Sequence, residues 1–168
     1  NLRGLILDMR GNPGGYLNQA VKVADRFLSD GVIVSTEEGS GVRGQTQKAS
    51  RAGTESDYPI AVLVNGSSAS ASEIVAGALK NHQRAIIVGE RTFGKGSVQH
   101  LIENGDYSKL KLTVAKYLTP GNKDIQSVGI PADILLQPSI IQSAEEDGED
   151  ANPVISLYWR EWLDREAD

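Results

Sequence analysis

Short apolar runs alternate along this chain with segments of helical periodicity, and the runs end at turns that contain glycine. The apolar runs that end in this way are residues 4–9, 60–64 and 85–88. Between the first two, residues 17–28 place apolar side chains at helical spacing, and a second helical pattern follows Ser72. Strands that alternate with helices in this manner predict an α/β domain.

Further strands are expected at residues 32–34, 97–102 and 110–117. The last of these alternates apolar and polar residues, which is typical of a half-exposed strand. Residues 39–57 are polar and lack any period, so we expect an exposed loop there. Residues 1–140 therefore form the predicted core, and residues 141–168 an acidic linker with a C-terminal helix that carries Leu157, Trp159 and Trp162.

Composition excludes several classes of function. The formal net charge of −5 argues against nucleic acid or an anionic membrane as a partner. The chain contains no cysteine, so it has no disulfide and no cysteine nucleophile, and no apolar run approaches the ~20 residues of a membrane span. Because the sequence starts without Met, we expect it to be a piece of a longer protein.

The segment 89–96 comes within one residue of the phosphate-binding pattern G-x-x-x-x-G-K-[ST]. Gly96 stands where that pattern needs a hydroxyl, and the residues after it favour a strand, whereas the pattern requires a helix. The pattern therefore does not favour a nucleotide site. Lys95 has a second interpretation, because glycines on both sides allow close backbone packing and Phe93 offers apolar cover. Desolvation favours the neutral amine, the only form that can accept a serine proton.

Ser70 stands three residues before Glu73 at the start of a predicted helix. This spacing is a capping box, and on the pattern alone a purely structural cap is the simpler interpretation. The same position suits a nucleophile, because free backbone N–H groups and the helix dipole lie beside it. A rival Ser–His–Asp mechanism would need one of the two histidines, placed by a carboxylate. His82 is expected to be exposed, whereas His100 is expected on a strand and the pattern alone does not exclude it. Neither belongs to a metal-ligand cluster, so no metal site is predicted.

Three longer motifs, at residues 7–15, 64–74 and 88–99, carry a resemblance to the carboxyl-terminal processing peptidases, also called tail-specific proteases. A weaker match at residues 128–133 has proline before Ala132 but keeps Asp133 in place. Together the motifs cover roughly residues 1–137 in the order of the family. The resemblance implies an α/β fold of the Clp-protease/crotonase class, a spiral of strand–strand–helix units.

The resemblance also implies site residues and a reaction. Ser70 would be the nucleophile, Lys95 its base and Gln99 the residue that orients the lysine, with an oxyanion hole built from the backbone N–H groups of Ala71 and of Gly14 or Gly15. The implied protein is a serine endopeptidase with a Ser–Lys dyad, which cleaves protein substrates near their C-terminus through an acyl-enzyme. It needs no metal or organic cofactor.

The family further implies partners and a location. Its members carry a peptide-binding PDZ domain ahead of the first strand, and this chain has none, so the PDZ domain of the parent chain is an expected partner. Substrates would bind extended by their C-terminal region, in the bacterial periplasm or cell envelope. The alternative is a non-catalytic fold relative that serves as a peptide-binding or assembly scaffold. The oligomeric state is open, a homo-oligomer included.

Overall fold

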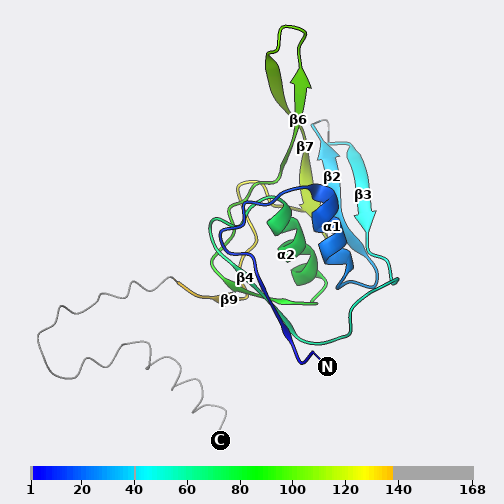
Figure 1. Ribbon diagram of the computed structural model, residues 1–168, viewed down its shortest axis with the longest axis vertical. Coiled ribbons are helices and arrows are strands. Elements are labelled where there is room, and N and C mark those ends of the chain that lie inside the picture. The colour runs from blue at the N-terminus through cyan, green and yellow to red at the C-terminus, as the bar shows by residue number, and fades with distance from the viewer. Residues whose placement is uncertain (1, 40, 138–168) are drawn as a thin grey trace, which may run out of the picture. The chain divides into compact units, whose positions relative to one another are not determined.

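The computed structural model describes residues 2–39 and 41–137 (Figure 1). The predicted linker and C-terminal helix therefore lie outside the described residues. In the described part the elements follow one another as β1 (Leu5–Asp8), α1 (Leu17–Asp25), β2 (Val32–Glu38), β3 (Arg43–Lys48), β4 (Ile60–Val64), α2 (Ala71–Asn81), β5 (Ile86–Gly89), β6 (Ser97–Glu103), β7 (Lys109–Thr119), β8 (Lys123–Asp124) and β9 (Ile134–Leu135).

A parallel sheet with the strand order β1-β4-β5-β9 positions the three motifs. Ile6 pairs with Ala61, which in turn pairs with Ile86, so the strands run in register in one direction. Each motif begins on one of these strands and continues into the loop after it. Because the carboxyl ends of parallel strands meet at one edge of a sheet, the fold brings the loops after β1, β4 and β5 together.

The second sheet is antiparallel, with the order β3-β2-β7-β6, and β8 pairs with β7. Helix α2 packs against β2 and β7 of this sheet and against β5 of the parallel one. Residues 71–79 of α2 are all buried, and a Cβ atom added to Gly77 would come within 2.6 Å of Thr119 on β7. This helix, which begins directly after Ser70, is thus fixed from several sides.

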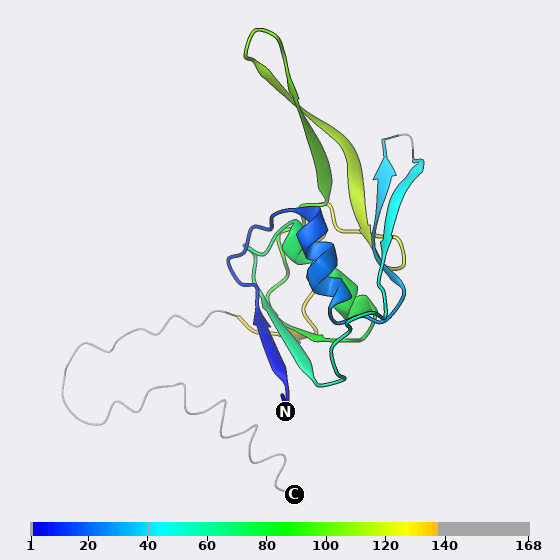
Figure 2. The ribbon, with the colours of Figure 1, turned by 45° about the vertical axis from the view of Figure 1, so that its right-hand side comes forward.

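Strands β6 and β7 continue beyond the rest of the second sheet as a two-stranded hairpin (Figure 2). Side chains on both of its faces are exposed. The prediction of one buried face for residues 110–117 is wrong at the tip, where Leu110 and Leu112 are 49% and 46% exposed. Nothing in the described residues covers this part of the strand, although its alternating pattern suits burial on one side.

The other element predictions are mostly confirmed, with strand β4 matching to the residue. The exception is the loop expected at residues 39–57, which contains strand β3. Its polar side chains are largely exposed as expected, but its backbone pairs with β2 at the edge of the sheet. No helix in the described ranges is long and apolar enough to cross a membrane.

Candidate active site

Ser70 occupies the N-cap position of α2 and is half-buried. Its backbone adopts φ 56° and ψ −116°, a left-handed conformation that costs a residue with a side chain of the order of 1–3 kcal/mol. Such strain persists only where surrounding contacts hold it. The next residue, Ala71, is the first residue of the helix, where backbone N–H groups have no partner within the helix.

The glycine-rich loop after β1 packs directly on this turn. The Asn12 carbonyl accepts hydrogen bonds from the Ala69 N–H (3.0 Å) and the Ser72 hydroxyl (3.1 Å). A Cβ atom on Gly14 would lie 2.6 Å from the Ala69 carbonyl oxygen and 2.8 Å from the Ala71 nitrogen, so only glycine fits there. The Gly14 N–H donates to the Asn12 side chain at 2.9 Å, whereas the Cβ position of Gly15 is open.

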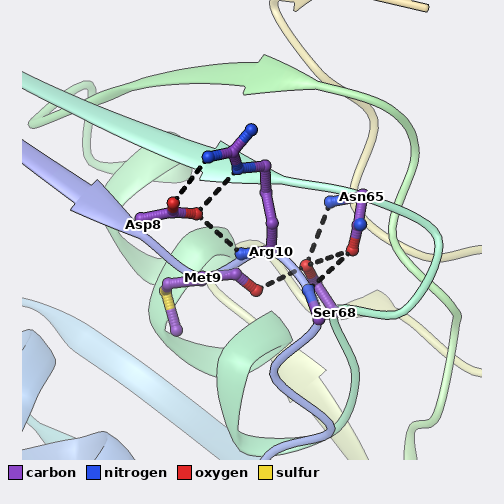
Figure 3. Close-up of polar contacts among 6 residues, drawn as sticks. Asp8, Met9, Arg10, Asn65 and Ser68 are labelled. Atoms are coloured by element: carbon purple, nitrogen blue, oxygen red, sulfur yellow. Dashed lines mark hydrogen bonds and ion pairs between the residues drawn. The ribbon is translucent and has the colours of Figure 1, made fainter. Parts of the chain in front are cut away.

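The base of the same loop is locked by a polar cluster that Figure 3 shows. The fully buried Ser68 hydroxyl donates to the Met9 carbonyl at 2.8 Å and accepts from the Asn65 N–H at 3.0 Å. Asp8 receives two hydrogen bonds from the Arg10 guanidinium, at 2.7 and 2.9 Å, and these lower the pKa of Asp8 to about 2. The loop after β1 and the turn after β4 are therefore joined into one structure.

Glu73, in the first turn of α2, is fully buried and binds groups from two different loops. Its Oε2 atom accepts the backbone N–H groups of Ser70 and Lys95, each at 2.8 Å. Its Oε1 atom accepts the Gly94 N–H at 2.7 Å and the Thr92 hydroxyl at 2.6 Å. The backbones of the two predicted catalytic residues are thus attached to a single carboxylate oxygen.

The loop that carries Lys95 alternates in burial. Thr92, Gly94 and Gly96 point inward and are buried, and the residues between them are exposed. The prediction that flanking glycines allow close packing is confirmed, since a Cβ on Gly96 would come within 2.8 Å of the Gln126 nitrogen. The expected apolar cover is not found, because the same alternation turns Phe93 outward, 65% exposed, and leaves Lys95 exposed too.

The side chains of Ser70, Lys95 and Gln99 form no hydrogen bond with one another within residues 2–39 and 41–137. Gln99 lies on β6, exposed, with its backbone paired to Thr113. The structure therefore brings the backbones of Ser70 and Lys95 together, while the side chains of the predicted dyad and of Gln99 do not contact one another through hydrogen bonds.

The two histidines have different surroundings. His82 was expected to be exposed, but it is half-buried, with Nε2 2.8 Å from the Val32 carbonyl oxygen and its ring beneath Gly31. This burial follows from the turn after α2, which folds back onto the start of β2. His100 lies on β6, as predicted, and its side chain is exposed. Residues 97–103 form a strand where a phosphate-binding loop would need a helix, which speaks against the nucleotide site.

Several residues of the site escaped the sequence analysis. Glu73 was recognised as part of a capping box, but its contacts to Thr92, Gly94 and Lys95 were not foreseen. Those donors lie about twenty positions away, and two of them are backbone groups without any sequence signature. Asn12 lies in the motif at residues 7–15 and Ser68 in the motif at residues 64–74, but the sequence alone assigned neither of them a role.

The sequence matches the model of peptidase family S41 over residues 1–136. It is 49% identical to the carboxy-terminal-processing protease of Bartonella bacilliformis over 142 residues, 81% of this chain and 31% of that protein. It is 40% identical to the chloroplastic C-terminal processing peptidase of Tetradesmus obliquus over 155 residues, 89% of this chain and 33% of that protein.

Among solved structures, the photosystem II D1 C-terminal processing protease is similar, with a TM-score of 0.77 and 39% identity. That match covers 84% of this chain and 36% of the other. The predicted fold class is thereby confirmed. The chain spans about a third of the length of the curated relatives it matches, at 31% and 33% of theirs. This chain belongs to peptidase family S41.

Proposed function

We propose that this chain is the catalytic core of a serine endopeptidase that cleaves protein substrates near their C-terminus through a Ser70–Lys95 dyad. The observation that carries the proposal is the shared attachment of the Ser70 and Lys95 backbones to one oxygen of Glu73. The strained backbone of Ser70 at the start of a buried helix adds support, since such strain clusters at catalytic sites.

In the proposed reaction the neutral Lys95 amine takes the proton of the Ser70 hydroxyl, and the Ser70 oxygen attacks the scissile carbonyl. The resulting serine ester is the acyl-enzyme, and Lys95 delivers the proton to the leaving amine. Water then attacks the ester by the same route, again with Lys95 as base. Gln99 would orient the lysine.

The oxyanion would be stabilised by the Ala71 N–H and by one N–H of the glycine loop. Asn12 already engages the Gly14 N–H, whereas the Gly15 N–H has no partner in the described part of the chain. The Gly15 N–H is therefore the second donor. The Gly14 N–H could serve instead only if it released the Asn12 side chain. Because Lys95 is exposed and not bonded to Ser70, we propose that a rotation of the lysine side chain completes the site when substrate covers it.

The substrate would lie extended and add to a strand edge through backbone hydrogen bonds, with capture aided by a PDZ domain of the full-length protein. The carboxyl-terminal processing names of the relatives support this choice of substrate. We place the protein in the bacterial periplasm or cell envelope. The family resemblance implies that location, and one relative is bacterial, while the name of the chloroplastic relative indicates that the family also works elsewhere.

The test is to incubate the full-length protein with an unstructured protein substrate and compare Ser70→Ala and Lys95→Ala with wild type. Ser67→Ala and Lys22→Ala are matched controls, since both residues are exposed and outside the proposed dyad. We expect Ser70→Ala to abolish cleavage and Lys95→Ala to reduce kcat/KM by roughly 10²–10⁴-fold. Equal cleavage by all variants would refute the dyad, and no cleavage by wild type would favour the scaffold alternative.

A further inference from the structure

We propose that Glu73 is a positioning residue, whose carboxylate holds the turn that carries Ser70 and the loop that carries Lys95 in a single arrangement. This inference rests on the proposed function for its catalytic consequence. The structural part of the proposal, that both segments are held by the same buried carboxylate, is independent of that function.

The number and origin of the donors go beyond a helix cap. In a capping box the Glu73 side chain accepts only one bond, from the Ser70 N–H. The other three donors come from residues 19, 21 and 22 positions away, on the loop after β5. A cap alone would leave that loop joined to the turn, within the described residues, only by the bond from the Phe93 N–H to the Ser68 carbonyl at 3.0 Å. The three additional bonds to Glu73 therefore strengthen the link between the two segments and attach the Lys95 backbone itself to it.

The chemistry of the four donors suits an ionised carboxylate, which only accepts hydrogen bonds. Glu73 is 0% exposed, and within the described residues no lysine or arginine side chain pairs with it. Its charge is instead compensated by backbone N–H groups, a hydroxyl and the N-terminal end of α2. The partners that stabilise the buried charge are therefore the same groups that must be held in place.

The strained backbone of Ser70 needs contacts that hold it in place. A serine with φ 56° keeps that conformation only where neighbouring contacts impose it, and the bond from its N–H to Glu73 is such a contact. The link also extends further along the chain, because the Thr92 hydroxyl donates to Glu73 and accepts the Ile130 N–H at 2.7 Å. One carboxylate thus connects the helix start, the Lys95 loop and the segment before β9.

The substitution Glu73→Gln tests this with little change in shape. An amide has one acceptor oxygen, and its NH₂ group can only donate. Each oxygen of Glu73 faces at least one backbone N–H, so in either orientation the amide confronts a backbone donor with another donor. Glu103→Gln, on the exposed end of β6, is the matched control.

The experiment measures cleavage kinetics and backbone amide hydrogen exchange in the full-length protein. We expect Glu73→Gln to lower kcat by about 10²-fold while KM stays within about threefold, since positioning acts on the reacting atoms rather than on substrate binding. We also expect the amides of Ser70, Gly94 and Lys95 to exchange about tenfold faster or more, with the Val62 amide of β4 unchanged. Glu103→Gln should alter neither quantity.

The two readouts separate the possible failures. If wild type does not cleave, the proposed function fails, and exchange alone still decides whether Glu73 links the segments. Unchanged exchange at Ser70 and Lys95, or equal acceleration at Val62, overturns the positioning role. If Glu73→Gln does not fold, Thr92→Val is compared with Thr92→Ser, which keeps the hydroxyl. A loss of kcat and of Gly94 protection in the valine variant alone supports the proposal, and equal behaviour of the two overturns it.

Discussion

The start of α2 and the β6–β7 hairpin differ in which side chains they bury. Around α2, polar side chains such as Ser68, Ser72 and Glu73 are buried and hydrogen-bonded to loops distant in the sequence. On the hairpin, the ion pair between Glu103 and Lys109 is exposed and joins only neighbouring strands. Large apolar residues are exposed there as well.

This difference has a physical consequence for function. A buried polar network leaves each group with a large penalty if its partner is lost, so it fixes one arrangement of the site. An exposed hairpin replaces lost partners with water. We therefore expect substitutions around α2 to change activity and stability strongly, and equivalent substitutions on the hairpin to change them little.

Apart from substitutions of the proposed dyad itself, the largest effect is expected for Gly14→Ala. A Cβ there would overlap the turn that carries Ser70, coming within 2.9 Å of the Ser70 Cβ, and φ at this position is +101°. We expect kcat to fall by roughly 10²-fold, because a shift of the turn would misplace the Ser70 hydroxyl relative to the reacting atoms. Gly66→Ala is the control, because Gly66 is exposed, lies outside the proposed catalytic groups and has nothing within 4 Å of its Cβ position. Equal losses of kcat in both variants would show that the close packing of Gly14 on the Ser70 turn does not determine activity.

The fold was predictable where apolar runs end sharply at turns, as at β4 and the start of α2. Strand β3 was not, because its side chains are polar and its stability comes from backbone bonds to β2, which leave no mark on composition. The alternating pattern of residues 110–117 likewise predicts one buried face, but it does not reveal whether another element packs on that face. In the described residues none does.

The identities of the candidate site residues came from motifs, whereas their surroundings did not. The motifs named Ser70 and Lys95, but not the direction in which the Lys95 side chain points. That direction follows from the alternation of the extended loop. Thr92 and Gly94 occupy its inward positions because both bind Glu73, and Lys95 therefore faces outward. Only the three-dimensional contacts of a buried carboxylate reveal this constraint.

The next effect is on stability, and it compares one isoleucine from each region. Ile74 on α2 is 1% exposed and Ile102 on the hairpin is 46% exposed. Ile74→Ala should lower the free energy of unfolding by about 2–5 kcal/mol, because it leaves a cavity in a packed core. Ile102→Ala should cost less than about 1 kcal/mol. Exchange of the slowest core amides measures both, and similar values would contradict the contrast between the two regions.

The smallest effect concerns the ion pairs of the two regions. Asp133 pairs with Lys80 near the end of α2 and accepts the Ile87 N–H at 2.9 Å. Burial alone would raise the pKa of Asp133, but the bonds from Lys80 and Ile87 outweigh it and lower the pKa below its ordinary 3.8. The resulting stabilisation is present above that ordinary value and is lost as the pH falls through the lowered pKa of the folded state.

Asp133→Asn should therefore destabilise the domain near pH 7 by up to about 1 kcal/mol, the range for partly exposed ion pairs. The difference from wild type should shrink as the pH falls below about 4, where the wild-type carboxylate also loses its charge. Glu103→Gln, which breaks the exposed hairpin pair, should change stability by less at every pH. Exchange of core amides between pH 3 and pH 7 compares the three proteins. A constant difference for Asp133→Asn across that range would show that its charge does not stabilise the region around α2.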